Sequence, residues 1–370
     1  MAIRRRKALA LVGGGLVLAA TAAGAGWYYA GTRTPSRAQE PWRLAGRQDE
    51  PRLRALSYAI LAPNPHNLQP WLADLRQPGR IAIHRDRRLA LSETDPYDRQ
   101  LTIGMGCFLE LLALAAAEDG HAVDFELFPQ GEDGPVAVAG FAPGGVPDPL
   151  FRHALARRTC REPFEPRPLP DDLVRQLAEH ARIVVEPGLV DSLVGLSRVA
   201  VEVELRTPRT LAATVDWMRL GKDEIEVSPD GIAIGGPLLE GLMAVGALDR
   251  AALRDRDSAT FDAMRRLLDR VLRATPAFAV LTTPDNTRLD QVAAGRRWMR
   301  LSLAAAGLGV AMHPVSQALQ EYRELSVHRR RAHELLAERG HAVQMLGRLG
   351  FGPVVEPAPR WPVEKRLLGG

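Results

Sequence analysis

Residues 62–71 read Ala-Pro-Asn-Pro-His-Asn-Leu-Gln-Pro-Trp, and this stretch does the most to decide the fold. It follows a run with helical spacing, in which Leu53, Leu56 and Ile60 recur until Pro63 ends the pattern. Its prolines and asparagines fix an irregular backbone, whose amides and side-chain carboxamides can face a heteroaromatic ligand. Without a ligand, the same stretch would be a structured surface turn.

Composition narrows the class of protein. The chain has 370 residues, of which 46% are hydrophobic and 25% charged, so it is neither disordered nor a small disulfide-stapled protein. The net charge of +4 equals that of Arg4, Arg5, Arg6 and Lys7 alone, so the rest of the chain is neutral. No basic footprint for nucleic acid remains, and we expect no nucleic-acid partner.

The N-terminal sequence is typical of a targeting segment. After the basic cluster, residues 8–30 carry no charge and are long enough to span a bilayer. We expect a signal peptide or membrane anchor over residues 1–31 and a linker over residues 32–50. Arg5 and Arg6 resemble a twin-arginine export signal, and a plain signal anchor is the alternative. The predicted location is the cell envelope, outside the cytoplasmic membrane, with membrane contact only through this segment.

A similar order of elements occurs twice along the chain. In each half a helix and a strand precede a long helix, and further strands follow it. Hairpins are mixed with other connections, so we expect an α+β fold rather than a regularly alternating α/β sheet. The two expected lobes cover residues 51–149 and 150–366, each a small, mostly antiparallel sheet flanked by helices. Long helices are expected over residues 101–118 and 289–306, and strands over residues 81–84, 123–128, 136–141, 277–282 and 342–351.

Three further segments could bind a ligand. The run Arg157-Arg158-Thr159-Cys160-Arg161 places guanidiniums and a hydroxyl where they could grip a phosphate monoester, although a solvated charge run is the alternative. Residues 306–316 leave a helix through Gly307 and Gly309, which allow close approach of the backbone to a flat ring. The segment Pro359-Arg360-Trp361-Pro362 offers one more arginine near the C-terminus.

These segments together resemble the nitroreductase family. Its members carry Ala-Pro-Ser-x-x-Asn-x-Gln-Pro-Trp, with Asn64 here in place of Ser, and Arg-Arg-Ser-x-Arg, with Thr159 in place of Ser. The resemblance implies an FMN cofactor, whose isoalloxazine edge Asn67 would hold and whose N5 atom the Ser316 backbone N–H would approach. No protein acid or base is required for catalysis. The implied FMN-binding residues are Pro63, Asn64, His66, Asn67, Gln69, Arg157, Thr159, Arg161, Pro314, Val315, Ser316 and Arg360.

The asparagine loop occurs only in the first half and the arginine motif only in the second. In homodimeric nitroreductases, each FMN is held by the arginine motif of one subunit and the asparagine loop of the other. The chain therefore resembles the Acg-type branch of the family, in which a fused pseudo-dimer keeps one complete site. The resemblance implies a monomer, and it implies a lid, for which residues 228–247 are the candidate.

The function implied by the resemblance is an FMN-dependent oxidoreductase. NAD(P)H is the expected donor, and a small electron-poor molecule such as a nitroaromatic or quinone is the expected acceptor. One alternative is a non-catalytic envelope protein that binds or sequesters FMN under a closed lid, and another is a scaffold whose site has decayed. We expect no metal site, and we expect Cys107 and Cys160 to be inert thiols.

Overall fold

The computed structural model describes residues 34–369, so the expected leader over residues 1–31 lies outside the described residues. The first lobe is a four-stranded antiparallel sheet in the order β1-β2-β4-β3. Its helices are α3 (Glu40–Leu44), α4 (Pro51–Ala59) and α5 (Arg99–Glu118), and its strands are β1 (Trp71–Asp74), β2 (Arg80–Arg85), β3 (His121–Leu127) and β4 (Ala137–Pro143).

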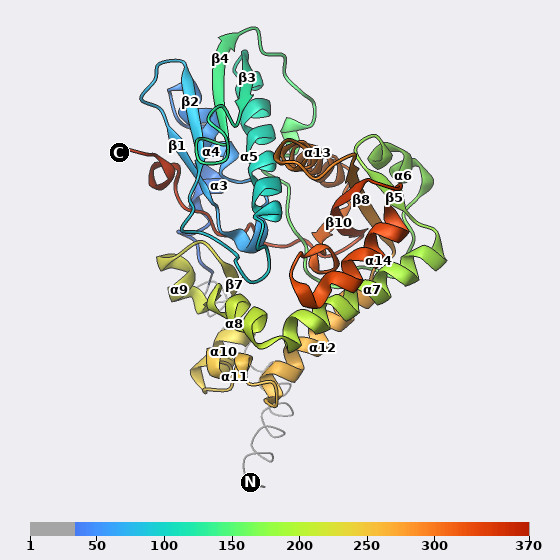
Figure 1. The fold of residues 1–370 in the computed structure, drawn as a ribbon. Coiled ribbons are helices and arrows are strands. Elements are labelled where there is room, and N and C mark those ends of the chain that lie inside the picture. The colour runs from blue at the N-terminus through green and yellow to red at the C-terminus, as the bar shows by residue number, and fades with distance from the viewer. Residues whose placement is uncertain (1–33, 370) are drawn as a thin grey trace.

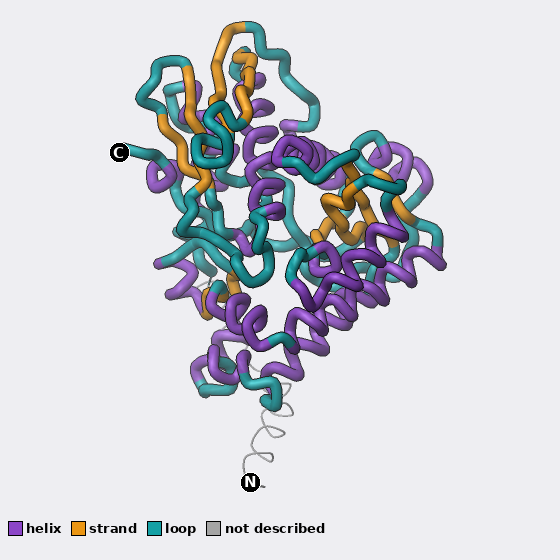
Figure 2. Tube along the Cα trace, in the orientation of Figure 1, coloured by secondary structure: helices purple, strands orange, loops and turns teal. Residues whose placement is uncertain are grey.

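The second lobe repeats this plan. Its four-stranded sheet has the order β5-β8-β10-β9 and is also antiparallel. Counted along the chain, the first, second, fourth and third strands lie side by side in both lobes, and a long helix follows the second strand in each. Its elements are α6 (Asp171–Ala178), β5 (Arg182–Val184), β8 (Ala277–Thr283), α13 (Arg288–Gly307), β9 (Ala311–Pro314), α14 (Ser326–Leu336) and β10 (Ala342–Gly350). The prediction of a duplicated α+β fold is confirmed (Figures 1 and 2).

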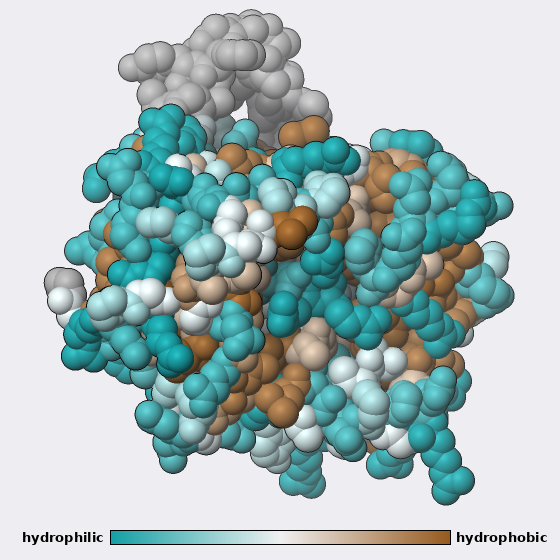
Figure 3. Space-filling view, turned by 90° about the horizontal axis from the view of Figure 1, so that it is seen from above, coloured by the Kyte–Doolittle hydropathy of each residue, from teal (hydrophilic) through white to brown (hydrophobic). Residues whose placement is uncertain are grey.

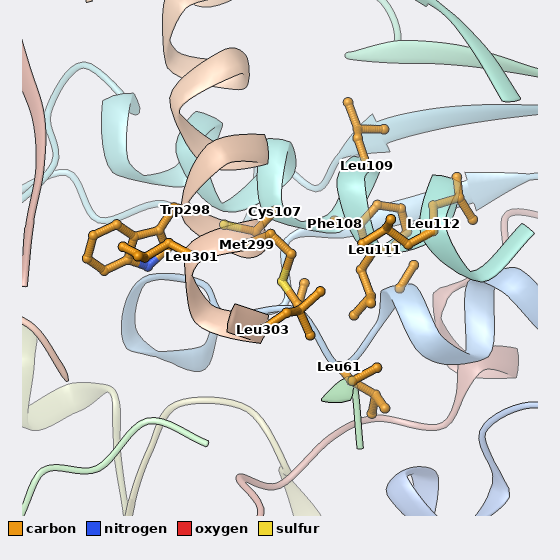
Figure 4. Close-up of a cluster of buried hydrophobic side chains, with 14 of the residues drawn as sticks. Leu61, Cys107, Phe108, Leu109, Leu111, Leu112, Trp298, Met299, Leu301 and Leu303 are labelled. Carbon is orange, nitrogen blue, oxygen red and sulfur yellow. The ribbon is translucent and has the colours of Figure 1, made fainter. Parts of the chain in front are cut away.

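The two lobes meet where α5 crosses α13. A Cβ added to Gly106 would lie 2.2 Å from the carbonyl oxygen of Val292, and one added to Gly295 would lie 2.0 Å from that of Ile103. Glycine at both positions therefore lets the two backbones touch. Around the crossing, side chains from both helices form a common core that includes Cys107, Phe108, Trp298 and Met299 (Figure 4).

Helix α5 is a core helix. It is long and apolar enough to cross a membrane by length and composition, yet 89% of that stretch is buried inside the molecule. Burial against the sheet of its own lobe and against α13 explains why nearly all of its faces are apolar. On the outer face drawn in Figure 3, hydrophilic side chains cover most of the surface and apolar patches lie between them.

The lobes differ in the connection between their first two strands. Residues 75–79 join β1 to β2, whereas residues 185–276 join β5 to β8. This long insertion passes below both lobes in the view of Figure 1 and reaches the asparagine loop of the first lobe. It contains α7 (Pro187–Arg206), α8 (Pro208–Asp216), β6 (Met218–Leu220), α9 (Gly221–Val227), β7 (Ile232–Ile234), α10 (Pro237–Ala244), α11 (Arg250–Arg254) and α12 (Ala259–Arg273), with β6 and β7 paired in parallel.

The C-terminal tail leaves the second lobe after β10 and crosses back to the first. Near its end the N–H of Leu368 donates to the carbonyl of Ala73 in β1 at 2.8 Å. On the way, the N–H of Arg360 donates to the carbonyl of Ala38, also at 2.8 Å. Residues 34–44, expected to belong to a linker, are thereby packed against the tail, and Trp42 is buried.

Candidate functional site

The asparagine loop has an unusual backbone. His66, Asn67 and Gln69 have φ values of 47°, 56° and 54°, in the left-handed region that non-glycine residues avoid at about 1–2 kcal/mol each. The side chain of Asn64 supports this conformation, because its Oδ1 accepts from the N–H of Gln69 at 2.8 Å. Strain of this kind persists only where surrounding contacts enforce it, and it gathers at functional sites.

The carboxamides of the loop bind main-chain groups of other segments. Asn67 Nδ2 donates to the carbonyls of Pro229 at 3.3 Å and Pro359 at 3.1 Å. Gln69 Nε2 donates to the same Pro229 carbonyl at 2.7 Å, and its Oε1 accepts from the N–H of Trp361 at 2.9 Å. The polar atoms expected to face a ligand therefore hold the insertion and the tail to the loop.

Arg360 is buried and closes the end of helix α4. Its Nε donates to the carbonyl of Ile60 at 2.8 Å, and its Nη2 donates to those of Leu61 and Ala62 at 3.1 and 3.0 Å. Its Nη1 donates to Asn67 Oδ1. A guanidinium suits this place because the last carbonyls of a helix lack partners and carry partial negative charge.

Two further arginines join Arg360 around Trp42. Arg157 Nη2 donates to the carbonyl of Leu61 at 3.0 Å, while its Nε is buried with no hydrogen-bond partner. The guanidinium carbons of Arg157, Arg158 and Arg360 lie 5.8, 4.7 and 5.7 Å from the centre of the Trp42 ring. Cations over an aromatic face are attracted to it. Sequence reasoning missed Trp42, although an isolated tryptophan in a polar stretch was an available signal.

The arginine cluster, defined here as Arg157, Arg158, Arg161 and Arg360, lacks a carboxylate partner. Within residues 34–369 none of the four forms an ion pair. Burial lowers the pKa of Arg360 well below its usual value, and Arg157, Arg161 and Arg158 lower it further. Burial also lowers the pKa of Arg157, to about 10. The charge of Glu356 acts on Arg158 in the opposite direction, without forming an ion pair. A group of arginines with no ion-paired carboxylate is suited to an anion.

Arg161 stands apart from the other three because its side chain is open to solvent. Desolvation by the surrounding protein nevertheless lowers its pKa. The charge of Arg161 acts on two histidines. Burial and then the charge of Arg161 lower the pKa of His66 to about 4, and the same two causes, with Arg348, lower that of His313 well below its usual value. Both imidazoles are neutral at pH 7, and His66 Nδ1 is buried without a partner.

The remaining predicted segment lies next to the same region. The N–H of Val315 donates to the carbonyl of Leu346 at 2.9 Å, which continues the pairing of Pro314 with β10. Ser316 Oγ donates to Oε1 of Gln100, in the first turn of α5, at 2.7 Å.

One turn further along α5, a Cβ added to Gly104 would lie 3.1 Å from Asn64 Cβ and from Pro65 Cδ. The first turns of α5 thus connect the Ser316 segment to the asparagine loop. On the other side, the N–H of Cys160 donates to the carbonyl of Met312 at 3.0 Å, which aligns the segment of Thr159 and Arg161 with β9. The structure therefore brings the predicted residues together from both lobes and the tail.

The two cysteines are buried, and potential metal ligands do not cluster in the described residues. The described part of the chain contains no group of three or more His, Cys, Asp or Glu side chains that could hold a metal ion. Cys107 and Cys160 are both buried. Burial raises the pKa of the Cys107 thiol to about 12 and also raises that of Cys160, so neither is a ready nucleophile.

These observations define a class of protein with a duplicated α+β fold, in which arginines gather where both lobes and the tail meet. Over 120 residues the chain is 32% identical to two proteins from Mycobacterium tuberculosis, strains CDC 1551 / Oshkosh and ATCC 25618 / H37Rv, each named "Putative NAD(P)H nitroreductase acg". This match confirms the resemblance that the motifs predicted. It covers 31% of the chain and 36% of each relative, so the chain matches about a third of the relatives' length.

Solved structures give more distant matches. The FMN-dependent nitroreductase NfnB from Mycobacterium smegmatis, in complex with NADPH, is 21% identical with a TM-score of 0.36, over 58% of this chain and 94% of that one. A nitroreductase-like family protein from Bacillus cereus is 13% identical with a TM-score of 0.33, over 60% of this chain and 97% of that one. No protein-family model matches the sequence.

Proposed function

We propose that the chain is an FMN-dependent oxidoreductase of the nitroreductase type. The observation that carries this proposal is the arginine cluster without a carboxylate partner, placed beside a strained loop where both lobes and the tail meet. The named relatives support it, since the M. tuberculosis proteins are named as NAD(P)H nitroreductases and the M. smegmatis structure as an FMN-dependent one.

The residues present fit a cofactor that ends in a phosphate monoester. Arg157 Nε is buried without a partner, and Arg161 is open to solvent, so both can donate to phosphate oxygens. Thr159 supplies a hydroxyl between them. Bound FMN would supply hydride acceptance and electron transfer, which no side chain of the protein can perform.

The other predicted residues act on position rather than on the reaction. Asn67 and Gln69 hold the loop in its left-handed conformation, and Arg360 fixes the end of α4 beneath it. His66 and His313 stay neutral beside Arg161, so they add no positive charge that would compete with it for the anion. The chain's contribution is a preorganised, cationic binding site.

For the donor we propose NADPH or NADH, and for the acceptor an electron-poor molecule such as a nitroaromatic or quinone. The test is a visible spectrum of the purified protein, followed by addition of either donor without oxygen. We expect flavin absorbance that bleaches on addition of the donor and returns with the acceptor. A protein that binds no FMN when it is supplied in excess would overturn the proposal.

A second candidate function is storage of FMN in a closed site. It is favoured by the strap, defined here as residues 229–231, which covers the asparagine loop. The carbonyl of Pro229 accepts from Asn67 and Gln69, and the N–H of Gly231 donates to the carbonyl of Asn67 at 3.2 Å. The strap begins the segment proposed as a lid. Flavin absorbance that persists in an excess of both donors would favour this alternative.

We further propose that the protein is a monomer held in the cell envelope by its N-terminal segment. The duplicated fold supports the first part, because two lobes already form the pair that a dimer would supply. The charge-free residues 8–30 support the second. A light-scattering mass near twice 40.4 kDa would contradict the monomer.

A further inference from the structure

Helix α10 and the turn after it expose apolar side chains and bury a charged one. Leu238, Leu242 and Val245 are 77%, 37% and 60% exposed, and their spacing of four and then three residues places them on one face of the helix. Glu240, which carries the only charge between Pro237 and Ala247, is buried. A helix in water shows the opposite arrangement, with its charges outward and its leucines inward.

Packing does not force this arrangement on the helix. Leu239 and Met243 on its inner side already contact the small core formed by α8, α11 and α12. Glu240 Oε1 accepts from the N–H of Lys222 at 3.1 Å and so ties α10 to α9. The outward leucines therefore form an additional apolar surface, and exposed apolar surface of this kind marks an interaction site.

The position of the N-terminal segment identifies what covers this surface. The backbone N–H groups of Arg37 and Ala38 donate to Glu226 at the end of α9, at 3.1 and 3.0 Å. The next residue, Val227, is exposed and apolar, and the strap and β7 lead directly from there to α10. The first residues of the folded body thus lie at the α9 end of the apolar surface.

The tether is too short to turn the body away from the membrane. Only residues 31–36 separate the charge-free residues 8–30 from Arg37, and six extended residues reach about 20 Å at most. If residues 8–30 span a bilayer, the side of the body that carries α9 must therefore face it. Helix α10 packs against α9 and therefore belongs to the same side of the body.

We propose that the docking face, defined as Val227, Leu238, Leu242 and Val245, rests in the interfacial region of the bilayer that anchors the chain. This inference rests on the anchoring part of the proposed function and is independent of FMN. Apolar side chains on the surface of a helix enter the boundary between headgroups and acyl chains in this way.

The test uses the full chain in vesicles of phosphatidylcholine with phosphatidylglycerol. A cysteine is introduced at the docking face by Val245→Cys and labelled with an environment-sensitive fluorophore. The matched control is Val146→Cys, which is 80% exposed in the loop after β4, far from α10 in Figure 1. Native Cys107 and Cys160 are buried, so the label selects the introduced residue.

In vesicles, we expect the fluorescence emission of the probe at position 245 to shift to the blue and its quenching by aqueous iodide to fall at least about fivefold. The probe at position 146 should show neither change. Equal quenching at both positions, in chains that resist carbonate extraction, would overturn the docking face and leave the anchor standing. Chains that carbonate removes would overturn both. Protection that needs no vesicles and rises with protein concentration would assign the face to a second copy of the chain. The flavin spectrum of the same sample reports separately on the cofactor.

Discussion

The two lobes share one sheet order and differ in what their connections do. In the first lobe residues 75–79 make a short turn, and the end of α4 supplies the strained asparagine loop. In the second lobe the equivalent connection is the insertion of residues 185–276, and the segment before α6 supplies the arginines. The common framework is fixed by its core. The single site arises from the segments in which the lobes differ.

Removing the arginines that only the second lobe supplies should have the largest effect. We expect the double variant Arg157→Ala with Arg161→Ala to weaken FMN binding by about 3–6 kcal/mol, because two charge-assisted hydrogen bonds are lost. The measurement is FMN affinity by titration of flavin fluorescence. The control is Arg152→Ala with Arg175→Ala, which removes two exposed guanidiniums outside the cluster. Unchanged affinity in the first variant would show that the phosphate binds elsewhere.

A substitution at the contact between the lobes should have an effect almost as large, on the free energy of unfolding. A Cβ at Gly295 would lie 2.0 Å from the carbonyl oxygen of Ile103 and 2.8 Å from Gly106 Cα, so we expect Gly295→Ala to lower the free energy of unfolding by about 3 kcal/mol. Gly195, in the middle of α7, has no atom within 4 Å of its added Cβ. There the same change should stabilise the protein by up to about 1 kcal/mol. Urea unfolding of both variants checks the opposite signs.

The histidine in the site should make the protein sensitive to acid. The pKa of His66 is lowered from 6.5 to about 4, so between these values the unfolded chain binds a proton that the folded chain does not. Stability therefore falls as the pH falls through this window. Between pH 7.5 and 4.5 the free energy of unfolding of the unmodified FMN-free protein should fall. We expect this fall to be smaller by about 2 kcal/mol in His66→Asn. His328→Asn on α14, outside the site, is the control, and an equal loss in both variants would contradict the assignment.

A substitution in the strap should have the smallest effect, and we expect it mainly on the rate of flavin reduction. Asp230 accepts from Arg219 Nη2 at 2.6 Å and from Trp361 Nε1 at 3.2 Å, so it fastens the strap to both the insertion and the tail. Asp230→Ala should lower the free energy that holds the strap in place by about 1 kcal/mol. Flavin reduction by NADPH should then become about fivefold faster. Stopped-flow bleaching measures this rate. Asp223→Ala on the exposed side of α9 should leave it unchanged, and an equal rate in all three proteins would show that the strap does not control access.

The sequence predicted the parts of the fold that long apolar patterns determine. Helices α5 and α13 were expected within two residues of their bounds, because an extended run of buried positions leaves a clear periodicity. Strands β1 and β9 were not expected. Each has four residues, and pairing with β2 or β10 rather than local preference makes it a strand.

At the site, the motifs identified which residues meet but not what each one contacts. The contacts of Arg360 with carbonyl groups at the end of α4 were not expected. Neither were the contacts by which the carboxamide of Asn67 joins the strap to the tail. These contacts join positions far apart in the chain, and spacing along a sequence carries no information about them. The FMN contacts of Arg360 and Asn67 stay predictions.

The return of the C-terminal tail to the first lobe sets an order on biosynthesis. Arg360 and Trp361 follow the last strand of both sheets in the chain, yet they complete the loop that comes after α4 near the start of the folded body. A nascent chain can therefore form both sheets before residues 360 and 361 have been made. Until then the asparagine loop lacks the contacts that these two residues supply, so it is completed after the sheets.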